Sequence, residues 1–156
     1  MYLFLLKIIN MQLSLELKKA IDNNAFTAIA TLLSNGEIQN HLMWVDYKDD
    51  SLLINTEKGR KKTLNIRENN SITLVVFEPS AMYSSWEIRG RVVEIIEDHT
   101  PNEHIDKLSN RYIKHPYARE DGISWEEAGI KDRELWIIEV DRLNSMIRPQ
   151  AKSEPE

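Results

Sequence analysis

Short segments rich in β-branched and aromatic residues, separated by polar turn residues, follow one another through most of this sequence. The sharpest turn signal is Asn35-Gly36, a dipeptide that favours a two-residue hairpin because both residues accept positive φ angles. Strands joined by such short turns pair antiparallel, since a parallel pair needs a long crossover. The expected strands cover residues 25–33, 37–47, 51–56, 72–77, 84–96 and 134–140. This pattern predicts a mainly β fold that forms an antiparallel barrel and argues against a doubly wound sheet.

Helical patterns occupy separate places between these strands. Residues 14–23 predict a short helix that begins after a candidate N-cap, Ser14. Residues 101–115 give the clearest helical spacing, which Pro116 ends. Residues 59–70 contain few apolar side chains and predict a short exposed helix or helical turn. We therefore expect a barrel with flanking helices.

A length of 156 residues is typical of one domain. Residues 14–148 contain no repeat or linker and predict a single folded domain. Residues 1–13 are expected to form a disordered or spurious N-terminal extension, because Met11 is a second candidate start. Residues 149–156 are expected to form a disordered tail, since they are polar and charged.

Composition and charge exclude several classes of function. The chain has no cysteine, which excludes disulfides, thiolate metal sites and a thiol nucleophile. Its net charge of −5 argues against a general nucleic-acid binder. The apolar run in residues 1–10 is far shorter than the roughly 20 residues of a membrane span. We expect a soluble, cytoplasmic protein with no membrane or nucleic-acid partner.

No catalytic or metal-binding constellation can be assigned from the residues. The sequence has no dinucleotide-binding glycine motif, phosphate-binding lysine loop, zinc-protease motif or serine-hydrolase elbow. The four histidines are scattered, at positions 41, 99, 104 and 115, so we predict no metal site. No acid–base pair stands out among the carboxylates, and the catalytic residues stay unassigned.

The most informative segment is a basic stretch directly after a predicted strand. It contains Lys58, Arg60, Lys61, Lys62 and Arg67 against Glu57 and Glu68, within a chain of net negative charge. Guanidinium and ammonium groups beside Asn55, Thr56 and the flexible Gly59 suit a phosphate, because they combine charge with free N–H donors. The alternative is a solubilising turn on a lysine-rich surface.

Two further segments combine aromatic and polar side chains. Tyr83, Trp86 and Arg89 would suit a planar ring with an anionic tail, although Trp86 fits the core and Arg89 a salt bridge equally well. In residues 41–44, alternation places Met43 and Trp44 on opposite faces of one strand, which is also typical of an ordinary barrel wall.

Taken together, these segments resemble the pyridoxamine-5′-phosphate-oxidase-like family of flavin-binding split β-barrels. The resemblance runs from about residue 28 to about residue 117. Its most specific part is I-N-T-x-x-G-R-x-K-x-x-N-I-R-x-N, which begins at Ile54, followed by I-R-G-R-V from Ile88. The resemblance implies a six-stranded split barrel of the FMN-binding type that works as a homodimer, with two cofactor sites at the subunit interface.

The family pattern also implies roles for individual positions. Met43 and Trp44, with Asn55 and Thr56, would flank the isoalloxazine ring. The basic segment would bind the cofactor phosphate through Arg60 and Lys62, and the Tyr83–Arg89 region would approach from the partner subunit. The expected cofactor-binding residues are thus Met43, Trp44, Asn55, Thr56, Lys58, Gly59, Arg60, Lys61, Lys62, Tyr83, Trp86 and Arg89.

The G-R-x-K and R-G-R-V segments look more like the branch of the family that uses the deazaflavin coenzyme F420. Residues 134–156 do not match the Trp- and Arg-containing segment that binds the substrate of true pyridoxamine phosphate oxidases, so vitamin B6 oxidation is not expected. We expect an oxidoreductase that passes hydride between reduced coenzyme F420, or FMN, and a small conjugated or heteroaromatic substrate. The alternative is a non-catalytic flavin or F420 carrier or sensor. A more remote alternative is a nucleic-acid-binding module, in which Trp44 and Trp86 would stack on bases.

Overall fold

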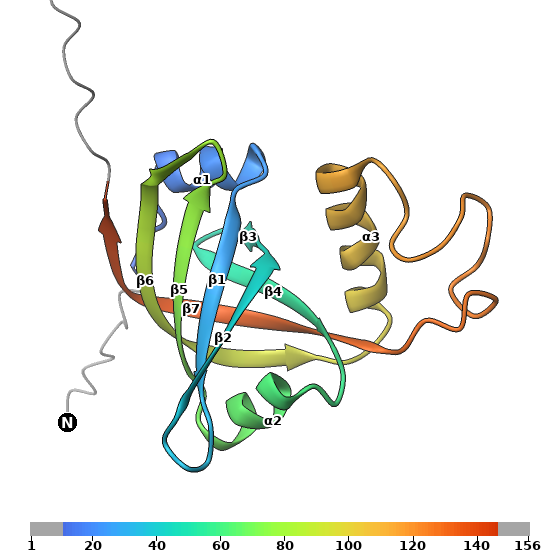
Figure 1. Ribbon diagram of the computed structural model, residues 1–156, viewed down its shortest axis with the longest axis horizontal. Coiled ribbons are helices and arrows are strands. Elements are labelled where there is room, and N and C mark those ends of the chain that lie inside the picture. Colours follow the sequence, from blue (N-terminus) through green and yellow to red (C-terminus); the bar gives the residue numbers. More distant parts are fainter. Residues whose placement is uncertain (1–10, 147–156) are drawn as a thin grey trace, which may run out of the picture.

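The computed structural model describes residues 11–146 of the chain and confirms the mainly β architecture (Figure 1). Residues 1–10 of the predicted extension 1–13, and the whole of the predicted tail 149–156, lie outside the described residues. The elements are α1 (Leu15–Asp22), β1 (Phe26–Leu32), β2 (Ile38–Trp44), β3 (Asp46–Lys48), β4 (Ser51–Glu57), α2 (Lys61–Glu68), β5 (Ser71–Glu78), β6 (Ala81–Ile96), α3 (Thr100–Ile113) and β7 (Arg133–Ser145).

The strands form one antiparallel sheet in the order β2-β1-β5-β6-β7-β4-β3. The strand expected over residues 37–47 is divided into β2 and β3, which are separated by Val45 alone. Because β2 pairs with β1 and β3 pairs with β4, this bent segment occupies both ends of the strand order and closes the sheet into a split barrel. The described residues therefore form seven strands where the sequence predicted six.

Side chains of α3 bind the backbone at this bend. The Arg111 guanidinium donates to the Val45 carbonyl at 2.5 Å, and the Tyr112 hydroxyl lies 3.4 Å from both the nitrogen and the carbonyl oxygen of Val45. A fully buried residue that leaves the strand ladder needs such partners, because an unpaired buried peptide group is costly. The bend places the end of β2 and the start of β3 beside α3.

The hydrophobic core fills the inside of the barrel. The long strand β6 turns Trp86, Ile88, Gly90 and Val92 inward. Gly90 is required by close packing, since a Cβ atom there would lie 2.2 Å from the carbonyl oxygen of Glu139 on β7. The helix α1 lies at one end of the barrel and α2 near the other (Figure 1).

Local signals set the ends of the helices. The Ser14 hydroxyl accepts from the backbone N–H of Leu17 and caps α1, as predicted. The predicted helix over residues 101–115 is confirmed as α3, which ends at Lys114 in a left-handed conformation, two residues before Pro116. Leu13, which precedes the predicted domain start, packs into the core. No helix among residues 11–146 has the length and hydrophobicity to cross a membrane.

Candidate functional site

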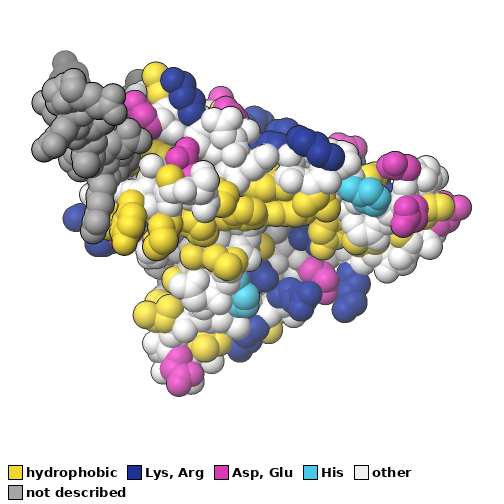
Figure 2. Space-filling view, turned by 45° about the horizontal axis from the view of Figure 1, so that its top comes forward, with side chains coloured by type: hydrophobic (Ala, Val, Ile, Leu, Met, Phe, Trp, Pro, Cys, Tyr) yellow, Lys and Arg dark blue, Asp and Glu magenta, His cyan; other side chains and the backbone are white. Residues whose placement is uncertain are grey.

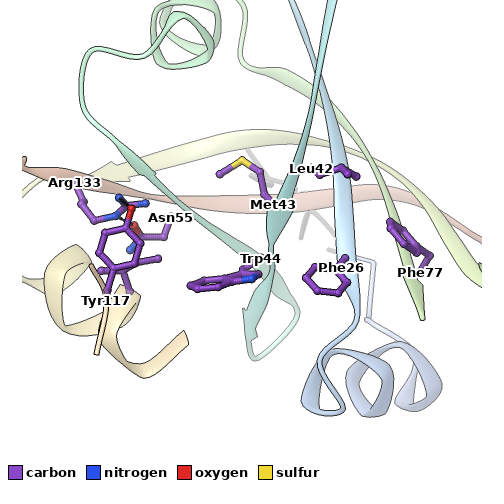
Figure 3. Close-up of a pocket in the computed structure, with 9 residues that line it drawn as sticks. Phe26, Leu42, Met43, Trp44, Asn55, Phe77, Tyr117 and Arg133 are labelled. Carbon is purple, nitrogen blue, oxygen red and sulfur yellow. Dashed lines mark hydrogen bonds between the residues drawn. The ribbon is translucent and has the colours of Figure 1, made fainter. Parts of the chain in front are cut away.

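Two adjoining cavities lie beside β2, one towards α3 and the other towards the end of β4 and the start of α2. The first, which we call the aromatic cavity, has a volume of about 550 Å³. It is lined by Phe26, Leu42, Met43, Trp44, Asn55, Phe77, Ile105, Tyr117 and Arg133. Asn55, Tyr117 and Arg133 gather at one end, whereas Phe26 and Phe77 lie at the other (Figure 3). Such a cavity suits a planar apolar ring with polar groups at one edge.

The second, the basic cavity, has a volume of about 440 Å³. It is lined by Gln39, His41, Met43, Thr56, Glu57, Arg60, Lys61, Lys62, Tyr117 and Arg133. Met43, Tyr117 and Arg133 line both cavities and so form their shared wall. A ligand with its ring in the aromatic cavity and an anionic chain in the basic cavity would contact this shared wall.

The basic segment after β4 shapes the basic cavity. β4 ends at Glu57, the chain turns through Gly59 with φ +77°, and α2 begins at Lys61. The predicted short helix is thus confirmed, but it is not exposed as predicted, since it buries Lys62, Thr63, Asn65 and Ile66. The N-cap residue, Arg60, makes no side-chain cap. The first N–H groups of a helix have no partner within it, and they sit at the positive end of its dipole. The same turn therefore contributes both cationic side chains and helix N–H groups, a combination that binds phosphate.

Two buried cations in this cavity lack a carboxylate partner. Lys62 is 9% exposed, and its ammonium makes no hydrogen bond or ion pair with any of residues 11–146. Arg133 is 7% exposed; its guanidinium donates to the Asn55 side-chain oxygen at 2.5 Å and the Tyr117 hydroxyl at 3.0 Å, and it forms no ion pair in the described chain. Burial of a charge without a counter-ion costs several kcal/mol, which a bound anion would offset.

The pKa values of two groups in this cavity are lowered by burial first and by the excess of positive charge second. Burial lowers the pKa of Lys62 below the ordinary lysine value, and the charges of Arg60 and Arg133 lower it further. Burial also lowers the pKa of His41, with Lys62 and Arg60 adding to the effect. His41 lines the cavity, and its buried Nδ1 atom has no hydrogen-bond partner among the described residues.

Most of the residues predicted for the site meet at these cavities. Trp44 and Asn55 line the aromatic cavity, Met43 lines both, and Thr56, Arg60, Lys61 and Lys62 line the basic one. Trp44 is held by stacking on Tyr112 of α3, with ring centroids 5.1 Å apart and planes 4° from parallel. Gly59 forms the turn before α2, and the Lys58 ammonium donates to the Glu97 carbonyl at 3.0 Å.

The predicted residues on β6 do not line either cavity within this chain. Trp86 is 3% exposed in the hydrophobic core, and Arg89 forms a 2.6 Å ion pair with Glu87. Tyr83 is half-exposed. Core packing of Trp86 and a salt bridge of Arg89 are the alternative roles that the sequence left open. A contact between this segment and the cofactor of a partner subunit stays a prediction.

Several lining residues were not predicted, above all Arg133 and Tyr117. Tyr117 follows α3 in a polar loop, and Arg133 is the first residue of β7. Nothing in their local sequence marks them, since they reach the site only through the packing of α3 and β7 around β4. Glu57, the one carboxylate among the lining residues, pairs with Arg60 and Lys131, at 3.5 Å each. The lining thus offers a binding surface but no nucleophile–base pair.

The geometry defines a class of protein: a split β-barrel whose site combines an aromatic cavity with an anion-binding cavity. The family model of pyridoxamine 5′-phosphate oxidase matches residues 13–146. The chain therefore belongs to the pyridoxamine 5′-phosphate oxidase family. The family includes oxidoreductases, and its split barrel is a flavin-binding type of fold.

Solved structures share this fold. An F420 reductase is 24% identical, covers 81% of this chain and 94% of its own, and superposes with a TM-score of 0.67. A protein from Bacteroides thetaiotaomicron, proposed to confer 5-nitroimidazole antibiotic resistance, is 18% identical over 86% of this chain and 84% of its own, with a TM-score of 0.60. A conserved hypothetical protein from Mycobacterium tuberculosis is 16% identical over 94% of both chains, with a TM-score of 0.67. No curated protein matches the sequence.

Proposed function

We propose that this protein binds coenzyme F420 or FMN and passes hydride between the reduced cofactor and a small conjugated or heteroaromatic substrate. The observation that carries the proposal is the pair of cavities, because the aromatic cavity shares a wall with the basic cavity. The basic cavity also contains two buried cations without carboxylate partners. Both cofactors join a planar tricyclic ring to a phosphate-bearing chain, so the residues present fit their two halves.

In this proposal each cavity binds one half of the cofactor. Arg60, Lys62 and the N-terminus of α2 bind the phosphate, while Met43 and Trp44 contact the ring. When bound, the cofactor supplies the hydride chemistry. The protein's own side chains bind and orient the ring and exclude water from it, which agrees with a lining that lacks a nucleophile–base pair.

The choice of cofactor and substrate class rests on supporting similarities. The G-R-x-K segment at Gly59 and the R-G-R-V segment at Arg89 favour coenzyme F420, and an F420 reductase is among the structural neighbours. Another neighbour is named for resistance to 5-nitroimidazoles, which are small heteroaromatic rings that accept electrons readily. These similarities support the proposal of a small heteroaromatic acceptor.

The test of hydride transfer is the oxidation of the reduced cofactor under anaerobic conditions. The purified protein is loaded with reduced F420 or FMN and mixed with nitroimidazole, quinone and enone acceptors, and the cofactor absorbance is followed against a protein-free control. If the protein is an oxidoreductase, the reduced cofactor is oxidised by at least one acceptor faster than in the control, and this oxidation is slower after Arg60→Ala with Lys62→Ala. Tight binding without any acceleration would instead identify a carrier or sensor.

A second part of the proposal is a homodimer formed through the outer face of β2, β1 and β5. On this face Leu42 lies beside Ala28, and Ala28 lies beside Val75, and Leu42 is 74% exposed. Figure 2 shows hydrophobic side chains in a band across one side of the molecule, with Lys and Arg side chains below it. Exposed contiguous apolar surface marks an interface. Because Leu42 also lines the aromatic cavity, a second copy on this face would cover that cavity's open side.

Substitution of Val75 by glutamate tests this face without touching either cavity. The partner surface would have to desolvate the new carboxylate, so we expect the dimer dissociation constant to rise about tenfold or more. Sedimentation over a concentration series measures this change. Leu15→Glu on α1, where Leu15 is 70% exposed, is the matched control and should leave the dimer intact. A Val75 variant as dimeric as the unsubstituted protein would contradict the assignment of this face.

The lowered pKa of Lys62 predicts a pH dependence of cofactor binding. A bound phosphate favours the protonated ammonium, but in the free protein Lys62 loses its proton below the ordinary lysine pKa of 10.5. The affinity for the phosphate-bearing cofactor should therefore fall as pH rises through the alkaline range below that value. Lys62→Met should lower the affinity at neutral pH and remove this fall, whereas Lys58→Met should retain it. A Lys62→Met variant with the original alkaline profile would exclude Lys62 as the titrating group.

A further inference from the structure

Arg133 occupies the shared wall of the two cavities in a fixed orientation. Its Nε atom donates to the Asn55 side-chain oxygen at 2.5 Å, and Nη1 donates to the Tyr117 hydroxyl at 3.0 Å. The guanidinium also lies 4.6 Å from the centroid of the Tyr117 ring. Its remaining nitrogen, Nη2, makes no hydrogen bond with any residue in the range 11–146, and the side chain reaches the aromatic cavity beside Asn55 (Figure 3).

Asn55 presents its oxygen to Arg133 because its amide nitrogen is fixed on the other side. That nitrogen donates to the Pro101 carbonyl at 2.7 Å and lies 3.2 Å from Nδ1 of His104. Since an amide nitrogen only donates, Nδ1 of His104 must be the acceptor, and the ring proton is then on Nε2. Rotation of the Asn55 amide would place N–H groups against the Nε–H of Arg133 and lose this bond.

Asp46 stabilises the tautomer of His104 that carries its ring proton on Nε2. Its carboxylate accepts from Nε2 of His104 at 3.2 Å, and from Lys107 and Arg111 at 3.1 and 2.9 Å. Burial alone would raise the pKa of Asp46, but hydrogen bonds from His104, Lys107 and Arg111 outweigh burial and hold the pKa well below its ordinary value. An ionised Asp46 therefore orients His104, which orients Asn55, which in turn orients Arg133.

We propose that Arg133 recognises an oxygen on the planar half of the ligand, separately from the phosphate contacts of Arg60 and Lys62, and that His104 and Asn55 position it. The proposal deepens the proposed function and rests on it, because the planar half is assigned to the aromatic cavity. Arg133 reaches both cavities but is joined by its hydrogen bonds to the aromatic end, beside Asn55. Its free N–H groups would meet a ring carbonyl or a ring oxygen that carries negative charge.

Paired ligands that differ only in the phosphate separate these two roles. The pair is FMN with riboflavin, or coenzyme F420 with the phosphate-free deazariboflavin, and the unsubstituted protein decides which pair is used. A charged hydrogen bond is worth about 10- to 100-fold in affinity. Arg133→Gln should weaken both members of the pair by the same factor within this range. Arg60→Ala with Lys62→Ala should weaken only the phosphate-bearing member.

Two substitutions of His104 test the positioning role. In His104→Asn, the side-chain oxygen can still accept from the Asn55 amide, whereas His104→Leu has no acceptor. We expect His104→Leu to reproduce the loss of affinity for both ligands seen in Arg133→Gln, and His104→Asn to restore most of it. In the ligand-free protein, the Nε–H signal of Arg133 in ¹⁵N NMR should persist in His104→Asn and exchange rapidly in His104→Leu.

Each outcome bears on one of the two claims. Equal affinities for the unsubstituted protein and Arg133→Gln, or a loss confined to the phosphate-bearing ligand, would overturn the recognition role. A protected Arg133 signal in folded His104→Leu would overturn the positioning role. If the unsubstituted protein binds neither pair, the proposed function fails and the recognition role with it, while the NMR comparison still decides the positioning role.

Discussion

Replacement of Arg60 and Lys62 together by alanine is expected to weaken binding of FMN or coenzyme F420 by about hundredfold or more. Each charged contact to a phosphate contributes about 1.5–3 kcal/mol, so the loss of two contacts amounts to at least about 3 kcal/mol. The fold should survive, because the Arg60 side chain is 61% exposed and Lys62 has no partner in the described chain whose loss would leave an unsatisfied group. Equilibrium titration and thermal unfolding of the same samples measure the two effects.

The matched control is Lys58→Ala. Lys58 belongs to the same basic turn, but its ammonium is bonded to the Glu97 carbonyl and does not line the basic cavity. Its loss should change cofactor affinity by less than about threefold, since a distant exposed charge is largely screened. An unchanged affinity in the double variant would remove the phosphate assignment. An equal loss of cofactor affinity in all variants would show that only the overall positive charge of the turn matters, and not contacts of Arg60 and Lys62 with the phosphate.

The second large effect is expected on stability, from Asp46→Asn. Asp46 is 3% exposed; it accepts a hydrogen bond from His104 and forms ion pairs with Lys107 and Arg111. Removal of one partner from such a buried cluster typically costs about 3–5 kcal/mol, and we expect about 3 because the Lys107 side chain is mostly exposed. Urea unfolding at neutral pH measures the difference in the free energy of unfolding.

The pH dependence of this difference has a definite sign. The folded-state pKa of Asp46 is held well below its ordinary value of 3.8, so the stabilisation is complete above that value and is lost as the pH falls further. The native protein should therefore approach the stability of Asp46→Asn in acid. Asp50→Asn, which removes a more exposed ion pair with Lys18, should cost about 1 kcal/mol or less. A similarly small cost for Asp46→Asn would contradict the role given to the cluster.

The fold could be predicted largely because its signals are local. The hairpin signal at Asn35-Gly36 and the N-cap at Ser14 each act within a few residues, and the structure has both where they were expected, although in the turn only Gly36 has a positive φ. The bend at Val45 could not be predicted, since residues 37–47 read as one continuous strand. The bend depends on α3, about 65 residues further on, whose Arg111 and Tyr112 bind the freed backbone.

The candidate site divides in the same way. The basic turn around Arg60 was visible as a cluster of charge in sequence, and the two strands that wall the aromatic cavity were visible as part of a family pattern. Arg133 could not be predicted as a site residue, because nothing in the local sequence distinguishes a single arginine at the start of a strand. Its importance comes from burial without a carboxylate partner and from the chain of contacts through Asn55 and His104, which are tertiary properties.

The proposed function requires that the two cavities together bind one phosphate-bearing flavin or deazaflavin. The most direct measurement is a titration of the purified protein with FMN and with coenzyme F420, following cofactor absorbance and tryptophan fluorescence. Trp44 lines the aromatic cavity, so ring binding should quench its emission. We expect saturable binding of at least one cofactor at micromolar concentration or below, with the tighter binding for F420. If neither cofactor binds at micromolar concentration, the family fold stands but the function proposed for it does not.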